Sequence, residues 1–290
     1  MKGIVLAGGT GSRLMPMTRV LSKQLLPVYD KPMIYYPIST LMLAGIRDIL
    51  IITTRKDSKS FVELLGDGSN FGVSFTYAIQ EEPRGLAQAL IIGEHFLQGN
   101  PCLMILGDNI FHGAGLGGEL RKIFPINGAH IFTYAVSDPS QYGILSLDSS
   151  GNVGSIVEKP AQSESNLAIT GLYFFDNQAS KIAKQVVPSS RGELEITSVL
   201  EKYLDQRNLT FTALSRGTAW LDTGNPNAMN DAANYIRVIE ERTGLKVACL
   251  EEISFANGWI SESQLDKLAS SNTTNEYGRY LRSLLPKLQN

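Results

Sequence analysis

A glycine-rich turn near the start of the chain holds the first residues that could do chemistry. Residues 8–13 read GGTGSR and follow a short apolar run. Glycines permit positive φ angles and let backbone N–H groups approach phosphate oxygens. The turn lacks the GxxxxGK[ST] pattern of a Walker loop, and the dinucleotide pattern GxGxxG would need Gly or Ala where Leu14 stands. Arg13 and Lys23 add charged donors where a triphosphate would lie. We therefore interpret the turn as a phosphate-binding loop. The alternative is a tight glycine turn without a ligand.

Two carboxylates follow apolar runs that read as strands. Asp108 ends the run 103–107, and Asp222 ends the run 219–221. Open α/β sheets bind ligands at the carboxyl ends of their strands, and Mg²⁺ takes one or two carboxylates together with phosphate oxygens and water. The pair therefore suits a magnesium ion, although each Asp could instead cap the turn that follows it. No zinc spacing is found among the histidines, which are predicted to be structural: His95, His112 and His130.

A second charged group lies in the middle of the chain. Pro160 predicts an extended backbone at Lys159, which would present Lys159 and Glu158 on opposite sides of the chain. A sugar phosphate needs both a cation and a carboxylate. Gly171, inside a predicted strand, indicates either close approach of a ligand or backbone, or a bulge. Residues in nearby loops could add further contacts: Tyr142, Gly143 and Arg191.

Composition limits the class of protein that carries these groups. Apolar residues make up 43% of the 290, and 26 basic against 28 acidic side chains give a net charge of −2, without the basic excess of a sequence-independent nucleic-acid binder. No apolar run is long enough for a signal segment or a membrane span. The two cysteines, Cys102 and Cys249, have no zinc or disulfide spacing. We expect a cytoplasmic protein that binds neither nucleic acid nor membrane.

The elements that must position the site follow from hydrophobic periodicity. Short apolar runs alternate with helical patterns in the first half, which is typical of a sheet built from βα units. Strands are predicted over 2–7, 49–54, 75–80, 102–107 and 131–136, and helices over 32–44, 58–65 and 86–97. Beyond residue 138, hairpin strands are predicted over 143–148, 153–159 and 168–175. A long helix over 225–241 and two shorter ones over 263–268 and 277–285 complete the chain.

Several spaced motifs together resemble a known family. In chain order they are LAGGTGSRL, SKQLLPV, GLAQA, GDN, EKP, TGLYFFD, RGELEIT and AWLDTG. This series is similar to the sugar nucleotidylyltransferases, and within them to the enzymes that transfer thymidylyl groups to glucose 1-phosphate, from residue 1 to about 285. The departures are Ile169 where Val is usual, Phe175 where Tyr is common, and the loop 112–118, which could alter a regulatory or subunit contact.

The resemblance implies a fold and an assembly. It implies a Rossmann-like, mostly parallel twisted sheet flanked by helices, with a hairpin-rich sugar-binding lobe and a helical C-terminal extension. The nucleotide-binding α/β core would occupy 1–137, the sugar-phosphate lobe and the return to the core sheet 138–224, and the helical region, as an assembly surface, 225–290. It also implies a homotetramer with a nucleotide-sugar feedback site at an interface.

The resemblance also implies the site residues. The nucleotide would contact Leu6, Gly8, Gly9, Thr10, Gly11, Ser12, Arg13, Lys23, Gln24, Gln80, Pro83, Gly85 and Asp108, with Gln80 reading the base edge. Glucose 1-phosphate would contact Asn109, Tyr142, Gly143, Glu158, Lys159, Ile169, Thr170 and Arg191. Mg²⁺ would be bound by Asp108 and Asp222, and the catalytic set would be Arg13, Lys23, Asp108, Lys159 and Asp222.

The implied reaction joins dTTP and glucose 1-phosphate to give dTDP-glucose and diphosphate, the entry to dTDP-L-rhamnose and related sugars of lipopolysaccharide and other cell-surface polysaccharides. A single in-line displacement at the α-phosphorus is expected, because the attacking phosphate oxygen is already ionised and no protein nucleophile is required. The alternatives are UTP or another sugar phosphate as substrate, a nucleotide-sugar sensor without turnover, and a nicotinamide oxidoreductase, which Leu14 argues against.

Overall fold

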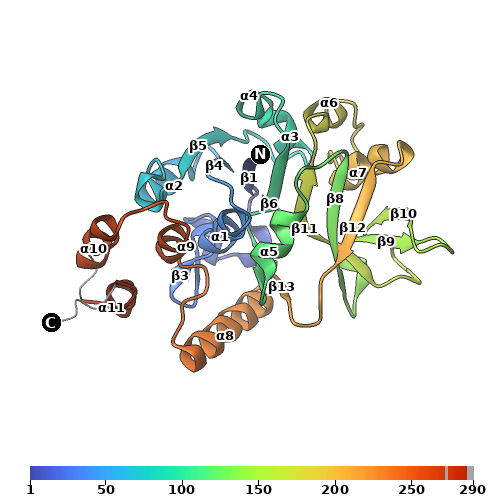
Figure 1. Ribbon diagram of the computed structural model, residues 1–290. Helices are drawn as coiled ribbons and strands as arrows, with labels where there is room; N and C mark the ends of the chain where they lie inside the picture. The colour runs from blue at the N-terminus through green and yellow to red at the C-terminus, as the bar shows by residue number, and fades with distance from the viewer. Residues whose placement is uncertain (272–273, 286–290) are drawn as a thin grey trace.

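A large mixed sheet forms the centre of the protein (Figure 1), whose computed structural model describes residues 1–271 and 274–285. Within these residues the sheet has nine strands, in the order β10-β9-β11-β6-β1-β4-β5, with β8 paired to both β11 and β12. The strands are β1 (Lys2–Ala7), β4 (Asp48–Thr53), β5 (Ser74–Ile79), β6 (Cys102–Leu106), β8 (Ala129–Ala135), β9 (Gly143–Leu147), β10 (Val153–Glu158), β11 (Leu167–Phe175) and β12 (Leu209–Ala213).

Four neighbouring strands of this sheet are parallel. β1 lies between β4 and β6, and β5 pairs with β4. β1, β4 and β6 read as nearly continuous apolar runs because both faces of the sheet are covered there, whereas β5, with the sequence SFTYAI, lies at the edge. Ala7 pairs with Thr53 and Leu6 with Leu106, so the carboxyl ends of β1, β4 and β6 meet at one edge. The glycine turn and Asp108 follow directly at that edge, as the sequence predicts.

Apart from β12, which pairs in parallel with β8, the rest of the sheet is antiparallel around β11. This strand pairs with β6, β8 and β9, and β9 forms a hairpin with β10. Its register with β8 shifts between Ile169 and Tyr173, so Gly171 lies at an irregularity, one of the two alternatives that its sequence position left open. Two small ribbons complete the strands: β7 (Asn109–His112) with β13 (Ala219–Asp222), and β2 (Pro27–Val28) with β3 (Lys31–Pro32).

Helices cover both faces of the sheet. They are α1 (Tyr35–Leu43), α2 (Ser58–Leu65), α3 (Gln88–Ile92), α4 (Glu94–Leu97), α5 (Leu116–Lys122), α6 (Ala179–Ala183), α7 (Ile196–Asp205), α8 (Pro226–Thr243), α9 (Leu250–Ala256), α10 (Glu262–Ser270) and α11 (Glu276–Ser283). Val5 packs in a core with α1, α2, α5 and α9, whereas Ile4 and Leu6 pack in a second core with α3, α6 and α7. This division follows the alternation of side chains along a strand.

Two predicted helices differ from the structure. The helix predicted from residue 32 begins at Tyr35, because Pro32 lies in β3. The helix predicted over 86–97 is divided into α3 and α4 at Gly93. A Cβ at Gly93 would lie 2.9 Å from the Cδ1 atom of Ile4, so this glycine lets the segment approach β1 closely. In the tail, α9 precedes the two predicted helices and was not expected.

The long helix α8 begins and ends as its sequence signals indicate. Asn225 caps it, since its side chain accepts a hydrogen bond of 3.0 Å from the backbone N–H of Ala228, and Pro226 is its first residue. Gly244, with a φ of 71°, ends it. In Figure 1, α8 lies below the sheet, and α10 and α11 lie on the side away from β9 and β10. No helix within the described ranges is long and apolar enough to cross a membrane.

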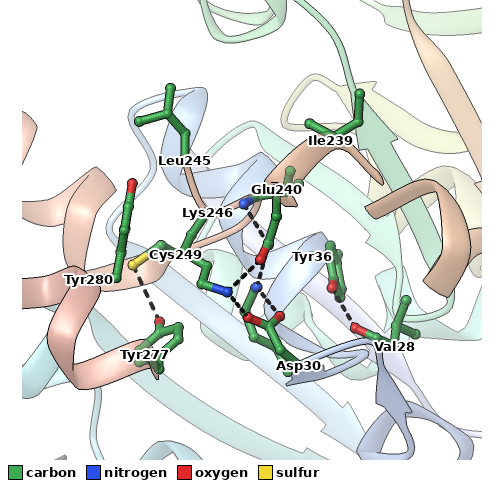
Figure 2. A network of polar contacts seen from close by, with 12 residues as sticks. Val28, Asp30, Tyr36, Ile239, Glu240, Leu245, Lys246, Cys249, Tyr277 and Tyr280 are labelled. Atoms are coloured by element: carbon green, nitrogen blue, oxygen red, sulfur yellow. Dashed lines mark hydrogen bonds and ion pairs between the residues drawn. The ribbon is translucent and has the colours of Figure 1, made fainter. Parts of the chain in front are cut away.

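A buried charge network joins the end of α8 to the β2–β3 ribbon (Figure 2). Lys31 pairs with Asp30 and, at 2.8 Å, with Glu240. Lys246 lies 2.5 Å from Asp30 and 2.7 Å from Glu240. The two cations and two carboxylates therefore neutralise one another where the C-terminal helices meet the N-terminal half. The hydroxyl of Tyr36 lies beside this network and donates to the carbonyl of Val28 at 2.7 Å.

Candidate active site

A single cleft of about 480 Å³ brings together nearly all the residues that the sequence nominated. It lies at the carboxyl ends of β1 and β6 and is completed by β9, β10, β11 and β13. The predicted residues that line it are Leu6, Gly8, Gly9, Thr10, Gly11, Ser12, Arg13, Lys23, Gln24, Gln80, Pro83, Gly85, Asp108, Asn109, Tyr142, Gly143, Glu158, Lys159, Ile169, Arg191 and Asp222. The exception is Thr170, which is fully buried and donates its hydroxyl to the carbonyl of Phe132 at 3.0 Å. Side chains alternate along β11, so Thr170 faces away from the cleft between two residues that face it.

The glycine turn needs its glycines for both conformation and space. Gly9 and Gly11 have φ angles of 96° and 59°, in the left-handed region that favours glycine. A Cβ at Gly11 would lie 2.8 Å from Thr18 Cγ2, and the Thr18 hydroxyl donates to the Gly11 carbonyl at 2.7 Å. The turn is thus tied to the segment that leads to Lys23, which places backbone amides and a cation on one side of the cleft.

Lys23 and Asp108 form an ion pair inside the cleft. The Lys23 Nζ atom lies 2.6 Å from Asp108 Oδ2, and the Lys23 side chain is only 9% exposed. The Asn109 amide nitrogen donates to the other carboxylate oxygen at 3.0 Å. Burial alone would raise the pKa of Asp108, but the Lys23 charge and the hydrogen bonds from Lys23 and Asn109 outweigh it and lower that pKa. Asp108 is therefore held as an anion.

Asp222 approaches the same place from another strand. Asp222 pairs with Asn109 in the β13–β7 ribbon, next to Asp108. Burial and the negative charge of Asp108 raise the pKa of Asp222, against the opposing effect of Lys23 and Arg13. The two neighbouring carboxylates line the same cleft and offer oxygen ligands of the kind that a divalent cation takes.

Asn109 joins three strands around these carboxylates. Its Oδ1 atom accepts from the Trp220 indole N–H at 2.6 Å and from the Gly171 backbone N–H at 3.2 Å. A Cβ at Gly171 would lie 2.5 Å from that oxygen, so the glycine makes room for the Asn109 amide. Asn109 is only 3% exposed. Although Asn109 lines the cleft, much of its hydrogen-bonding capacity is used to hold β7, β11 and β13 together beside Asp108.

The opposite wall of the cleft carries a second charged cluster. Arg191 lies 3.3 Å from Glu158 and 2.8 Å from Glu195. The Lys159 Nζ atom lies 3.7 Å from the same Glu158 oxygen. The predicted extended backbone at Lys159 is wrong, because its φ is 44°, in the left-handed region. That conformation turns Lys159 and Glu158 toward one cleft instead of toward opposite sides of the chain.

An aromatic pair connects the two walls. The rings of Tyr142 and Trp220 lie 5.1 Å apart, and the Tyr142 carbonyl accepts from the Lys159 backbone N–H at 3.0 Å. Burial and the charges of Asp222 and Asp138 raise the pKa of Tyr142, so its hydroxyl stays protonated and can donate a hydrogen bond. Trp220 thus contacts both the carboxylate side and the Lys159 side of the cleft.

Beyond the glycine turn, the cleft ends in a polar corner. The Gln80 Nε2 atom donates to Gln88 Oε1 at 2.8 Å, and the Arg84 backbone N–H donates to that same oxygen at 3.0 Å. Gly85 has a φ of 108°, and a Cβ there would lie 2.4 Å from the Leu194 carbonyl oxygen. Gln80 was predicted from the sequence, whereas Gln88 was not.

Sequence reasoning also missed Glu195 and Trp220. Both occur in motifs that were noticed, RGELEIT and AWLDTG, but an isolated Glu or Trp gives no signal of its own. Their partners come from segments far away along the chain: Trp220 donates to Asn109, and Glu195 belongs to the cluster that contains Glu158. Only the folded chain shows these contacts.

Comparison with known proteins gives consistent matches over most of the chain. A sequence model of the family described as nucleotidyl transferase matches residues 2–238. A glucose-1-phosphate thymidylyltransferase of Neisseria meningitidis is 51% identical over 99% of this chain and 100% of its own, and one of Xanthomonas campestris is 54% identical over 98% and 96%. A Bacillus anthracis protein assigned as a glucose-1-phosphate thymidylyltransferase, solved with sucrose, matches with a TM-score of 0.76 and 40% identity over 82% of this chain and 95% of its own.

Proposed function

Since this chain belongs to the nucleotidyl transferase family, we propose that it transfers a thymidylyl group from dTTP to glucose 1-phosphate, giving dTDP-glucose and diphosphate. The observation that carries this proposal is the convergence of two charged groups in one cleft. Arg13 and Lys23 lie on the wall of the glycine turn, and Lys159 and Arg191 on the opposite wall. Two polyanionic substrates need two sets of cations, because each brings several negative charges to one reaction centre.

The nucleotide is assigned to the wall of the glycine turn. Its triphosphate would lie along residues 8–13, with Arg13 and Lys23 as charged donors, and its base would reach toward Gln80. The sugar phosphate is assigned to the wall with the second cluster. There Lys159 would bind the phosphate, and Glu158 would accept hydrogen bonds from sugar hydroxyls.

Asp108 and Asp222 fit a magnesium ion that arrives with the nucleotide. Among the described residues no three His, Cys, Asp or Glu side chains form a metal-binding group. Mg²⁺ commonly takes one or two carboxylates, with phosphate oxygens and water as its other ligands, so two are enough. The geometry supports this assignment, since Asp222 pairs with Asn109 in the β13–β7 ribbon and so lies next to Asp108 in the cleft. When bound, the ion supplies charge stabilisation to the reacting phosphate.

The chain's own residues bind and align the two substrates. Lys159 would hold the sugar phosphate so that one of its oxygens faces the α-phosphorus of dTTP. Arg13 and Lys23 would neutralise charge that develops on the α-phosphate and on the leaving diphosphate. Neither a histidine nor a cysteine is found among the described residues that line the cleft, and the attacking oxygen is already ionised. These features support one direct displacement without a covalent intermediate.

The decisive experiment measures diphosphate release from every nucleoside triphosphate with glucose 1-phosphate. The proposal predicts turnover that needs both substrates and is fastest with dTTP. Turnover only with UTP or with another sugar phosphate would keep the reaction class and change the substrate. Nucleotide-sugar binding without any turnover would indicate a sensor instead of an enzyme.

We also infer a homotetramer with a feedback site for the nucleotide-sugar product at an interface, and a role in the supply of dTDP-L-rhamnose and related cell-surface sugars. The resemblance to the sugar nucleotidylyltransferases is the support for both. Exposed Val238 on α8 and Leu245 just after it give the C-terminal region apolar surface that an assembly could cover. Sedimentation velocity with and without dTDP-glucose tests the assembly.

A further inference from the structure

Gln80, which lines the polar corner of the cleft, is joined in a fixed orientation to the amide of the neighbouring Gln88. The Arg84 backbone N–H, which is shared with the Glu82 carbonyl at 2.9 Å, can only donate, so the Gln88 atom that faces it at 3.0 Å is the amide oxygen. The same oxygen lies 2.8 Å from the Gln80 side chain, which must therefore present its nitrogen to Gln88. The Gln80 amide cannot turn over without placing two oxygens in contact. Gln88 thus decides which end of the Gln80 amide is an acceptor.

The other end of the Gln80 amide faces the glycine turn. A Cβ at Gly8 would lie 2.0 Å from Gln80 Oε1, so this oxygen occupies the space that a side chain at position 8 would fill. Gln80 is only 4% exposed, and its backbone N–H donates to the Thr53 carbonyl at 2.8 Å. The amide is therefore held at both its backbone and its side chain, with its oxygen next to the phosphate-binding turn.

From this geometry we propose that Gln88 is a positioning residue that sets the choice of nucleobase. The hydrogen bond to Gln88 uses one of the two N–H groups of the Gln80 amide. The carbonyl oxygen and the other N–H group remain for a ligand. That pair complements the N3–H and a keto oxygen of a pyrimidine dione such as thymine or uracil. Cytosine presents an acceptor at N3 and an amino group, so it faces two mismatches. The inference rests on the proposed function, in which Gln80 meets the base.

The segment that carries Gln88 is fixed before any substrate binds. The Ala87 N–H donates to the Leu194 carbonyl at 3.0 Å, and the Leu194 N–H donates to the Arg84 carbonyl at 2.6 Å. Gly85, which lies between these two bonds, leaves no space for a side chain against Leu194. The Arg84 N–H that orients Gln88 is therefore held by the second wall of the cleft. Such preorganisation lets the amide reject a wrong base without first being ordered.

The test compares Gln88→Leu with Gln88→Glu at saturating glucose 1-phosphate. The carboxylate of Gln88→Glu still accepts from Gln80 and Arg84, so its preference for dTTP over dCTP should match the wild type. Gln88→Leu frees the Gln80 amide to turn, and the ratio of kcat/KM for dTTP to that for dCTP should fall about tenfold, the factor expected for one hydrogen bond to a base. The ratio for dTTP to UTP should stay unchanged, because both bases present the same edge. The KM for glucose 1-phosphate should also be unchanged.

A donor-only side chain provides a second test if Gln88→Leu does not fold. Gln88→Lys should attract the oxygen of Gln80, turn the amide and shift preference toward dCTP. The inference fails if Gln88→Leu slows all three nucleotides equally, if Gln88→Glu loses selectivity as Gln88→Leu does, or if Gln88→Lys keeps the wild-type preference. Failure of the proposed function would instead show in the wild type, as no turnover of dTTP or a preference for a different base.

Discussion

The two cleft carboxylates should respond to neutral substitution with opposite changes in stability. Asp108 is paired with Lys23 at 2.6 Å, and its pKa is lowered although burial opposes this. Asp222 lies beside Asp108, and burial and that neighbouring charge raise its pKa. Without metal and nucleotide, Asp108→Asn should therefore destabilise the fold, whereas Asp222→Asn should leave it equally stable or more stable. Both variants should lose activity, because each removes one of the two carboxylates assigned to magnesium.

The structure indicates the size of each effect. Breaking a buried ion pair lowers the free energy of unfolding by about 3–5 kcal/mol. The Asp108 side chain is 24% exposed, and an Asn there can still accept a hydrogen bond. We therefore expect Asp108→Asn to lower the free energy of unfolding by about 1–3 kcal/mol. At about 2 °C per kcal/mol for a chain of this size, the Tm of Asp108→Asn should fall by about 2–6 °C. Removal of a neighbouring like charge is worth up to about 1 kcal/mol, so the Tm of Asp222→Asn should rise by about 2 °C at most.

Calorimetric melts in EDTA at neutral pH, without nucleotide, provide the measurement. Because the folded pKa of Asp222 is raised, ionisation destabilises the wild type above that pKa. The advantage of Asp222→Asn should therefore shrink as pH falls through the raised folded pKa, and it should disappear below the unfolded value of about 3.9, where the wild-type carboxyl is protonated in both states. A loss of stability in Asp222→Asn as large as in Asp108→Asn would refute the reasoning. It would mean that Asp222 is a structural residue of its turn and not a carboxylate awaiting a cation.

Three further predictions concern the two walls and the reaction course. Lys159→Ala should weaken glucose 1-phosphate binding about tenfold or more, which is the usual cost of truncating one charged partner. Calorimetry should show dTTP binding almost unchanged. Equal weakening of both ligands would contradict the assignment of Lys159 to the sugar phosphate. Trp220→Phe keeps a ring against Tyr142 but removes the hydrogen-bond donor to Asn109. As a result, kcat should fall about tenfold, while the KM for each substrate should change little. An unchanged kcat would exclude a positioning role for the indole. A chiral α-thio analogue of dTTP should yield product with inverted configuration at phosphorus, whereas net retention, or a labelled nucleotidyl-protein formed without glucose 1-phosphate, would indicate two displacements.

The parallel half of the fold could be predicted from the sequence because its signal is local. Strands such as β1 are continuous apolar runs that end at a glycine turn, and α8 carries both its N-terminal cap and its terminal glycine. Helix boundaries were less predictable where a distant contact decides them. One predicted helix is divided at Gly93, where a side chain would meet Ile4, which is far away in the sequence.

The residues of the candidate site, like the elements of the fold, could be predicted only where the signal lies in the local sequence. Charged residues at strand ends, such as Asp108, can be found from type and position. Positioning residues cannot, because their role exists only through a partner: Trp220 through Asn109, and Gln88 through Gln80. The error at Lys159 has a similar cause, since the residue before a proline is extended by preference, and here the surrounding structure overrides that preference.

The buried charge network between α8 and the β2–β3 ribbon has a consequence for truncated forms of the chain. The family match ends at residue 238, inside α8 and two residues before Glu240. A chain cut there would lose Glu240 and Lys246 and keep Lys31, whose side chain is 2% exposed, with Asp30 as its only remaining partner in the network. The β2–β3 ribbon begins two residues after the helical turn that holds Lys23. We therefore expect a minimal catalytic fragment to extend beyond residue 238, because without Glu240 and Lys246 the β2–β3 ribbon next to the turn that holds Lys23 loses part of its support.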